Sequence, residues 1–476
     1  MLTRFEVSGF KNLRDVAVDL GPFTCIAGPN GVGKSNLFDA IAFLGSLADH
    51  SFNDAIASVR SVPGQRGTQE SVLSAAVLSG EENLRLAAEV IIPGSVRDVR
   101  GRQVRLRHTY LRYEVELGVD TGYQGKRAAP IRLIEESIVS ATRPPACPAL
   151  VDAVKVSRSK ETYIETDPQI PVSHDEEGEP TAREPGAFLY DRGMEESLGP
   201  FGDMGFMYNP DEYFFFRDLD RTVLSQSRAG TVPGQVAAQL RSWRFLALEP
   251  SLIRAADSID QTGRLADSGA HLPAALNARV EERGAQVYDD LRHALGDLLD
   301  LRHLEVIRNG DFLELRAQVG EGPELPARAL SDGSLRLLVL GALATGIDGA
   351  GAVFIEEPEN GVHPARLHAL LDLLRSMAGP RQDGQEERGQ VVINTHSPYV
   401  VQGVMEADPE DVLCAVSWRR RSDTGEVTTS TSFHPLPGTW RAADREGPGG
   451  ERRIQPVSST ELIDFLESPV MAEDEQ

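Results

Sequence analysis

The feature that most constrains the fold of this 476-residue chain is a glycine-rich run, GPNGVGKS, at residues 28–35. It fits the pattern G-x-x-x-x-G-K-[ST], in which glycines let backbone N–H groups point at phosphate oxygens. An apolar segment, Phe23–Ala27, precedes the run as an expected strand, and apolar residues at helical spacing follow from Asn36 to Leu47. This strand–loop–helix context favours a phosphate-binding loop over a simple glycine turn. In such a loop Lys34 would reach the β- and γ-phosphates, and the Ser35 hydroxyl would bind Mg²⁺.

A second motif supplies carboxylates. The apolar segment Ala352–Ile355 is an expected strand, and Glu356 and Glu357 follow it directly. The first carboxylate at such a strand end typically holds Mg²⁺ through its water shell, beside the phosphate loop. The second can act as general base toward the attacking water. The alternative, a solvated strand end with two chance acids, is weakened by the phosphate loop elsewhere in the chain.

Further blocks follow in a fixed order, and together they identify a family. Residues 330–336 (LSDGSLR) resemble the signature of ABC-type ATPases in its RecF-like form, and residues 356–364 (EEPENGVHP) resemble that family's Walker B and D-loop. Residues 394–398 (NTHSP) resemble its switch-histidine segment, and residues 10–13 (FKNL) its N-terminal strand-turn near the nucleotide base. The chain therefore resembles the SMC/RecF-like ABC-type ATPases, and within them the prokaryotic stand-alone AAA-family ATPases found in anti-phage defence systems.

The resemblance implies an α/β fold: an ABC-type P-loop ATPase head, with a mixed sheet, flanking helices and an inserted α+β lobe. It implies two heads that sandwich two ATP molecules with Mg²⁺ and so act as a switch. In this arrangement Ser331 and Gly333 would contact the γ-phosphate bound by the other chain, His396 would sense it, and Glu357 would activate water. The residues implied to bind nucleotide are Asn30, Gly31, Gly33, Lys34, Ser35, Asn36, Ser331 and Gly333; Lys34, Glu357 and His396 would be catalytic, and Ser35 and Glu356 would bind the metal.

Four segments are expected. They are the N-terminal half of the head at 1–75, an inserted β-rich and helical lobe at 76–320, the C-terminal half of the head at 321–410, and a C-terminal extension with an acidic tail at 411–476. Within the lobe the patterns predict strands at 84–92, 110–117, 131–138, 304–308 and 312–319, and helices at 236–244 and 272–299, the latter interrupted near Gly284. Residues 143–235 form the least regular stretch, with an exposed acidic loop at 174–180.

Two positions depart from the family pattern. Asp332 stands where many relatives have a second glycine, and Glu356 stands where many have aspartate. Both variants are familiar among the stand-alone prokaryotic relatives. The Q-loop cannot be placed from the pattern, and Gln65 and Gln69 are candidates for it.

The formal charge of −24 argues against a general nucleic-acid coat, since attraction to phosphate needs positive potential. A local basic face for DNA is still open. Arginines cluster around an expected hairpin, and Arg105 and Arg107 would share one strand face; a solvated polar face explains them at least as well. The cluster comprises Arg97, Arg100, Arg102, Arg105, Arg107 and Arg112, with a second basic patch at 418–421.

The chain shows no run of eighteen uncharged apolar residues and no signal-peptide pattern, so we expect no membrane contact. Its three cysteines lie far apart, which suits a reducing cytoplasm. The absence of heptads argues against a long SMC-type coiled coil, and the absence of a CxxC pair argues against a zinc hook. We also expect no appended Toprim nuclease domain, because the 74 residues after Gln402 are too few for one.

Three functions were weighed against these features. The favoured one is a homodimeric, or higher homo-oligomeric, regulatory ATPase that controls a separate effector such as a nuclease. A RecF-like DNA-repair clamp is the alternative. An ABC-transporter subunit fits poorly, because its phosphate loop and signature lie much closer together in the chain.

Overall fold

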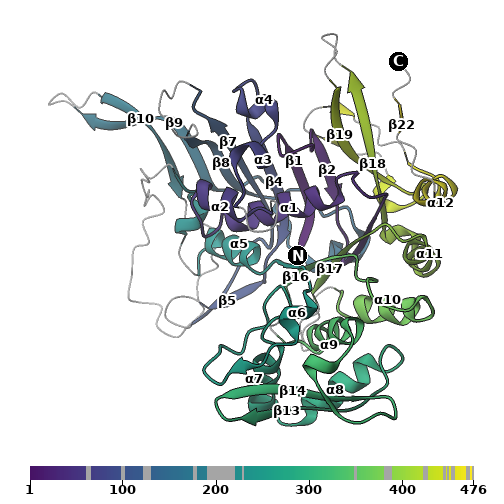
Figure 1. The fold of residues 1–476 in the computed structure, drawn as a ribbon. Coiled ribbons are helices and arrows are strands. Elements are labelled where there is room, and N and C mark those ends of the chain that lie inside the picture. Colours follow the sequence, from purple (N-terminus) through teal and green to yellow (C-terminus); the bar gives the residue numbers. More distant parts are fainter. Residues whose placement is uncertain are drawn as a thin grey trace.

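The computed structural model describes most of the chain. The described residues are 1–60, 66–97, 102–121, 130–174, 180–189, 220–227, 230–347, 351–379, 389–421, 427–442, 446–447, 450–451, 456–467 and 472–473. They form two large sheets and a helical lobe (Figure 1).

The first sheet is antiparallel throughout and has the order β10-β9-β8-β7-β4-β1-β2. Along β1 buried and half-buried residues alternate, as expected for a strand with one face against a core. The seven strands are β1 (Leu2–Ser8), β2 (Val16–Asp19), β4 (Leu84–Ile91), β7 (Tyr110–Val119), β8 (Ile131–Ser140), β9 (Thr162–His174) and β10 (Pro180–Leu189).

The second sheet is mixed and has the order β11-β16-β17-β3-β18-β19. Its first five strands are parallel, and β19 runs antiparallel to β18. Every residue of β3 and β17 is buried, because helices or the first sheet cover both faces. The strands are β3 (Phe23–Ala27), β11 (Arg244–Leu246), β16 (Ala352–Glu356), β17 (Gln390–Thr395), β18 (Val412–Arg421) and β19 (Val427–Pro435), and β22 (Ala472–Glu473) pairs with β18.

The parallel strands separate two hydrophobic cores. Phe354 and Val392 point to the core that contains α1 (Lys34–Ser46) and the first sheet. Their neighbours Val353, Ile355 and Val391 point to the other core, which contains α9 (Asp332–Ala344), α10 (Leu367–Ser376) and α11 (Pro398–Ala407). Alternate side chains of one strand thus reach opposite layers, which fixes the register of the sheet.

The helical lobe lies at the bottom of Figure 1 and packs on α9. Gly284 has a φ of 82° and separates its two longer helices, as the sequence predicts. The lobe comprises α6 (Pro250–Ile253), α7 (Leu272–Arg283), α8 (Gln286–Leu295) and the strands β12 (Asp257–Ser258), β13 (Leu301–Asn309), β14 (Phe312–Val319) and β15 (Leu325–Pro326).

The remaining elements are short or peripheral. They are α2 (Phe52–Ser58), α3 (Gln69–Val72), α4 (Ala75–Leu78), α5 (Val232–Arg241), α12 (Ser459–Glu467), β5 (Ser95–Arg97), β6 (Gln103–Arg105), β20 (Glu446–Gly447) and β21 (Gly450–Glu451). Among the described residues no helix combines the length and apolarity needed to cross a membrane.

The expected α/β fold class and the expected strands are confirmed, with two differences. The described part of residues 143–235 is more regular than expected, because β9 and β10 pair there and α5 follows. Residues 175–179 of the acidic loop, 190–219 and 228–229 lie outside the described part. The helix expected at 236–244 begins at Val232, since the Thr231 hydroxyl caps it by accepting from the Gly234 N–H at 3.1 Å.

Segments distant in sequence share sheets. Strand β1 pairs with β4 across the expected boundary at residue 75, and β18, in the expected C-terminal extension, pairs with β3 from Val412 to Cys414. The four expected segments remain a prediction, but their strands are built into common sheets.

Candidate active site

A cavity of about 510 Å³ opens where the parallel strands of the second sheet end. The phosphate loop (residues 28–35) follows β3, the acidic pair follows β16, and residues 247–249 follow β11. Carboxyl ends of parallel strands are the usual place for ligand sites in such sheets. The cavity is lined by Asn30, Gly31, Gly33, Lys34, Ser35, Asn36, Ala247, Leu248, Glu249, Arg336, Leu340, Ile355, Glu356, Glu357, Pro358, Asn360 and Asn394.

Residues that are distant in sequence hydrogen-bond to the phosphate loop and to the start of α1. Gly33 has a φ of 104°, and a Cβ there would overlap the Thr431 hydroxyl of β19. That hydroxyl donates to the Val32 carbonyl at 2.5 Å and accepts from the Asn12 amide at 2.8 Å. The Asn12 carbonyl oxygen in turn accepts from the Asn36 amide at 2.7 Å. Only glycine therefore fits at position 33 in the observed conformation of the loop.

Lys34 begins α1 and is buried beneath the loop. Its ammonium donates to the carbonyls of Gly28 at 2.6 Å and Pro29 at 2.7 Å. Burial lowers the pKa of Lys34, although the nearby carboxylates of Glu357 and two further glutamates counteract part of this shift. The amino group of Lys34 therefore lies beneath the loop and close to the carboxylates of three glutamates.

Glu356 is held by a guanidinium that the sequence patterns did not single out. Arg60 binds both of its oxygens, at 2.6 and 2.9 Å, and also donates to Asp39 on α1 at 2.8 Å. Burial opposes ionisation of Glu356, but Arg60 outweighs it, and with help from the Ser35 hydroxyl and the Asn394 amide lowers the pKa of Glu356. Glu356 is therefore an ionised carboxylate beside Ser35.

Glu357 has a backbone φ of 45°, which is uncommon for a residue with a side chain. One of its carboxylate oxygens lies 2.8 Å from His396 Nδ1, and the other accepts from the Asn360 amide at 2.8 Å. Its N–H donates to the Asn394 carbonyl at 3.0 Å. These contacts join the turn after β16 (residues 357–361, the β16 turn) to the switch segment after β17 (residues 394–398).

The signature segment (residues 330–336) lies outside the cavity except for Arg336. Ser331 caps α9, and its hydroxyl accepts from the Ser334 N–H at 3.1 Å. Gly333 lies so close to the β16 turn that a Cβ there would overlap the Gly361 carbonyl. Arg336 donates to the Asn360 carbonyl at 3.1 Å. The segment therefore touches the β16 turn of its own chain and not the phosphate loop.

Thus the structure brings together eight of the expected residues around one cavity: Asn30, Gly31, Gly33, Lys34, Ser35, Asn36, Glu356 and Glu357. His396 joins them through Glu357, whereas Ser331 and Gly333 stand apart. Their roles stay predictions. Of the Q-loop candidates, Gln65 lies outside the described residues, and Gln69 is buried in α3 and does not line the cavity.

Sequence reasoning missed Arg60, Asp39 and Glu249. Arg60 follows the short helix α2 in a stretch without regular apolar periodicity, so no pattern distinguished it. Glu249 could have been found from its place after an apolar segment, because the β11 strand end lies beside β16.

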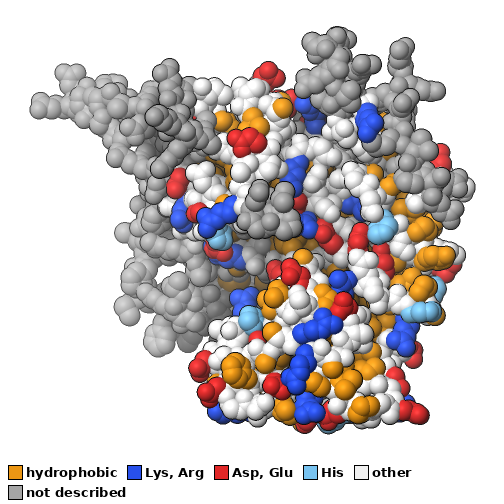
Figure 2. Space-filling model, viewed as in Figure 1, with side chains coloured by type: hydrophobic (Ala, Val, Ile, Leu, Met, Phe, Trp, Pro, Cys, Tyr) orange, Lys and Arg blue, Asp and Glu red, His pale blue; other side chains and the backbone are white. Residues whose placement is uncertain are grey.

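The arginine cluster is not one basic face. Arg112 lies 2.6 Å from Glu6 and 2.5 Å from Glu114 in ion pairs on the first sheet, so its charge is neutralised. Arg105 ends β6 and Arg107 lies beyond it, both exposed, while Arg100 lies outside the described residues. Figure 2 shows Lys and Arg interspersed with Asp and Glu over the described surface of the face in view.

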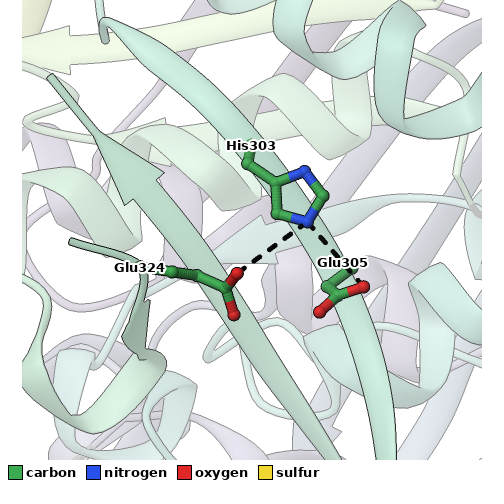
Figure 3. A group of neighbouring side chains, drawn as sticks. All are labelled: His303, Glu305 and Glu324. Atoms are coloured by element: carbon green, nitrogen blue, oxygen red, sulfur yellow. Dashed lines mark ion pairs between the residues drawn. The ribbon is translucent and has the colours of Figure 1, made fainter. Parts of the chain in front are cut away.

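A second group of potential metal ligands lies on the lobe. His303, Glu305 and Glu324 turn toward one another (Figure 3), with His303 Nε2 3.7 Å from Glu305 and 4.0 Å from Glu324. Arg316 already pairs with Glu324 at 2.6 Å, and all of these side chains are partly exposed. A surface ion-pair network accounts for the group, and we assign it no metal.

Comparison with known proteins gives one matching family model and several relatives similar to part of the chain. The family model described as "AAA domain, putative AbiEii toxin, Type IV TA system" matches residues 23–116 and 211–402. The DNA replication and repair protein RecF of Streptomyces avermitilis is 27% identical over 175 residues, which cover 35% of this chain and 44% of RecF. The OLD nuclease of Thermus scotoductus is 49% identical over 41 residues, or 9% of this chain and 8% of the nuclease. The matched regions thus span less than half of each relative.

Solved structures show only a distant likeness. An SMC head bound to the C-winged helix domain of ScpA is 12% identical with a TM-score of 0.41, over 91% of this chain and 98% of that one. The SMC head domain from Thermotoga maritima is 13% identical with a TM-score of 0.35, over 91% of this chain and 98% of that one. The fold assignment therefore rests on the strand order and the motifs placed above.

Proposed function

The chain belongs to this AAA-domain family and is an SMC/RecF-like ABC-type ATPase by kinship, and on that premise we propose that it binds ATP with Mg²⁺ and hydrolyses it. The observation that carries the proposal is the single cavity in which Lys34, Ser35, Glu356 and Glu357 meet. A phosphate loop alone indicates binding. Two carboxylates at the end of β16, which β17 separates from β3 in the same sheet, add the groups that hydrolysis needs.

The donor set fits Mg²⁺. The Ser35 hydroxyl lies close enough to the Glu356 carboxylate to help lower its pKa, so two hard oxygen ligands lie together beside the phosphate loop. Arg60 occupies both oxygens of that carboxylate and would have to yield one of them. Bound there, Mg²⁺ would supply charge stabilisation at the β- and γ-phosphates.

In the proposed reaction each residue has a distinct task. The Lys34 ammonium moves its hydrogen bonds from the Gly28 and Pro29 carbonyls to phosphate oxygens. Glu357 accepts a proton from water while the water oxygen bonds to the γ-phosphorus and the bond to the ADP oxygen breaks. His396 and Asn360 keep the Glu357 carboxylate in place through their contacts with its two oxygens.

The direct test measures phosphate release from Mg²⁺–ATP. We expect Lys34→Ala to lower the rate by about 100-fold or more, because the γ-phosphate loses its cation. Lys160→Ala, which changes an exposed lysine outside the cavity, is the matched control and should behave as wild type. Equal rates in Lys34→Ala and wild type would refute ATP hydrolysis at this site.

We further propose that two heads pair around ATP and that the pair acts as a switch for a separate effector in prokaryotic anti-phage defence. Ser331 and Gly333 support pairing, because both lie outside the cavity of their own chain and Ser331 is exposed. The family description, which names a toxin–antitoxin system, supports a role beside a second protein. ATP would stabilise the paired state, and hydrolysis would remove the contacts made through the γ-phosphate.

A RecF-like DNA-repair clamp is the second candidate, and the similarity to RecF favours it. It predicts that DNA stimulates the ATPase and that the stimulation falls steeply with salt. Exposed arginines near β6, such as Arg105 and Arg107, would then contribute, and Arg105→Ala with Arg107→Ala would reduce stimulation. ATPase activity indifferent to DNA and salt would leave the regulatory switch as the better account.

A further inference from the structure

The carboxyl group of Glu359 has no part in the reaction above, although it lies in the β16 turn beside Glu357. Its Oε2 atom is buried and has no hydrogen-bond partner among the described residues. Burial raises the pKa of Glu359, and the charge of Glu357 adds to the shift. A buried carboxyl group with an unpartnered oxygen destabilises a fold, so its presence needs an explanation.

Its other oxygen, Oε1, accepts a hydrogen bond from the hydroxyl of Thr395, the last residue of β17. Thr395 is fully buried, and its Oγ1 also accepts from the Ser397 N–H at 2.9 Å. The hydroxyl of Thr395 thus donates its single proton to Glu359 while its oxygen accepts from Ser397. The backbone carbonyl of Thr395 accepts from the N–H of Gly28, the first residue of the phosphate loop, at 3.2 Å.

These contacts place Thr395 at a junction of three segments. Glu359 comes from the β16 turn, Ser397 from the switch segment and Gly28 from the phosphate loop. The two residues of the expected hydrolytic pair lie next to this junction, with His396 following Thr395 and Glu357 preceding Glu359 in the same turn. The His396–Glu357 distance of 2.8 Å therefore depends on how firmly the turn is fixed to the strand end.

We propose that Glu359 is a positioning residue, whose carboxyl group fixes the β16 turn to the Thr395 hydroxyl and thereby holds Glu357 against His396. The inference deepens the proposed function and rests on it. The left-handed backbone of Glu357 makes such a restraint necessary, because a residue with φ near 45° relaxes unless its surroundings hold it. The signature segment packs against the same turn at Gly361. The contact between Glu359 and Thr395 therefore also affects where the signature segment lies.

The test separates positioning from general stability with paired variants. Thr395→Val keeps the shape and removes the hydroxyl, whereas Thr395→Ser keeps the hydroxyl; Glu359→Ala removes the acceptor, whereas Glu359→Gln keeps an acceptor oxygen. Thr262→Val, at an exposed threonine of the lobe, is the control for the substitution itself. Steady-state ATP hydrolysis gives kcat and KM, and hydrogen exchange gives the mobility of the β16 turn.

We expect Thr395→Val and Glu359→Ala each to lower kcat about 10- to 100-fold while KM for ATP changes less than about 3-fold, because misplacing the base affects the chemical step more than binding. Thr395→Ser and Glu359→Gln should restore most of the rate. The double variant Thr395→Val/Glu359→Ala should be no slower than the slower single variant, because both remove one contact.

Hydrogen exchange tests the restraint without any turnover. The N–H groups of Asn360 and Val362 are bonded within the turn, at 3.0 Å to the Glu357 carbonyl and 2.9 Å to the Glu359 carbonyl. They should exchange about 10-fold faster in Thr395→Val but not in Thr395→Ser. Unchanged exchange in Thr395→Val, or equal losses of kcat and ATP affinity that Thr395→Ser and Glu359→Gln do not restore, would overturn the inference. A wild-type chain that hydrolyses no ATP would instead refute the proposed function, and exchange would still decide the role of Glu359.

Discussion

Glu136 shows how one buried residue can make stability depend on pH. It is fully buried on β8, accepts from the Tyr113 hydroxyl at 3.1 Å, and accepts from the N–H groups of Val223 at 2.7 Å and Leu224 at 3.0 Å. Burial is the main cause that raises the pKa of Glu136 from 4.5 to about 7, and the hydrogen bonds only limit the shift. Its stabilising contribution is therefore fully present below pH 4.5 and is lost as the pH rises through 7.

We predict that the free energy of unfolding of wild type, relative to Glu136→Gln, falls by roughly 2–3 kcal/mol between pH 5 and pH 8. Glutamine does not titrate, so any constant cost of the substitution cancels in the comparison. Denaturant unfolding of both proteins at a series of pH values measures the difference. Parallel curves across that range would show that Glu136 ionises normally in the folded chain.

At the scale of elements, strand β19 contacts the phosphate loop, and the sequence motifs do not predict this contact. The pattern G-x-x-x-x-G-K-[ST] predicts the loop, the strand before it and the helix after it, because all three are local. It does not predict that Thr431 lies behind Gly33, since nearly 400 residues of chain separate them and only the pairing of β18 with β3 brings them together.

That contact predicts a sharp effect of Gly33→Ala. The added methyl group would meet the Thr431 hydroxyl, and alanine would also be strained at a φ of 104°. We expect ATP binding to weaken by about 10-fold or more, measured by calorimetry with a non-hydrolysable analogue. Gly438→Ala is the matched control, because φ there is 77° but the space around it is open, so binding should not change. Normal affinity in Gly33→Ala would mean that the loop does not need its observed shape.

For the acidic pair, too, the sequence predicts the local position but not the contact with a distant residue. Its position at a strand end could be predicted from an apolar run followed by Glu356 and Glu357. The bidentate pairing of Glu356 with Arg60 could not, because Arg60 comes from a stretch without regular pattern. We predict that Arg60→Lys lowers the ATPase rate about 10-fold, since lysine lacks the planar guanidinium that contacts Glu356 and Asp39 at the same time. Steady-state rates at several Mg²⁺ concentrations measure this. A full rate at every concentration would show that Arg60 does not set the position of Glu356.

For the whole molecule, the order of the motifs along the chain predicted the fold class, whereas the four expected segments remain a prediction. Motifs that are distant in sequence converge, because β3, β16, β17 and β18 lie side by side in one parallel sheet. The expected lobe and C-terminal extension, by contrast, share sheets with the head, since period-two patterns show that a strand exists but not which strand it pairs with. We infer the pairing of two molecules from the position of the signature segment.

The proposed function requires that one head pairs with a second head around ATP and that Glu357 acts in the hydrolysis of this ATP. The most direct test measures oligomeric state and ATPase rate of wild type and Glu357→Gln with ATP and Mg²⁺, with and without DNA. We expect Glu357→Gln to accumulate an ATP-dependent dimer and to turn over at least about 100-fold more slowly than wild type. If neither dimerisation nor turnover responds to the substitution, Glu357 is not the base and the two-head mechanism is wrong.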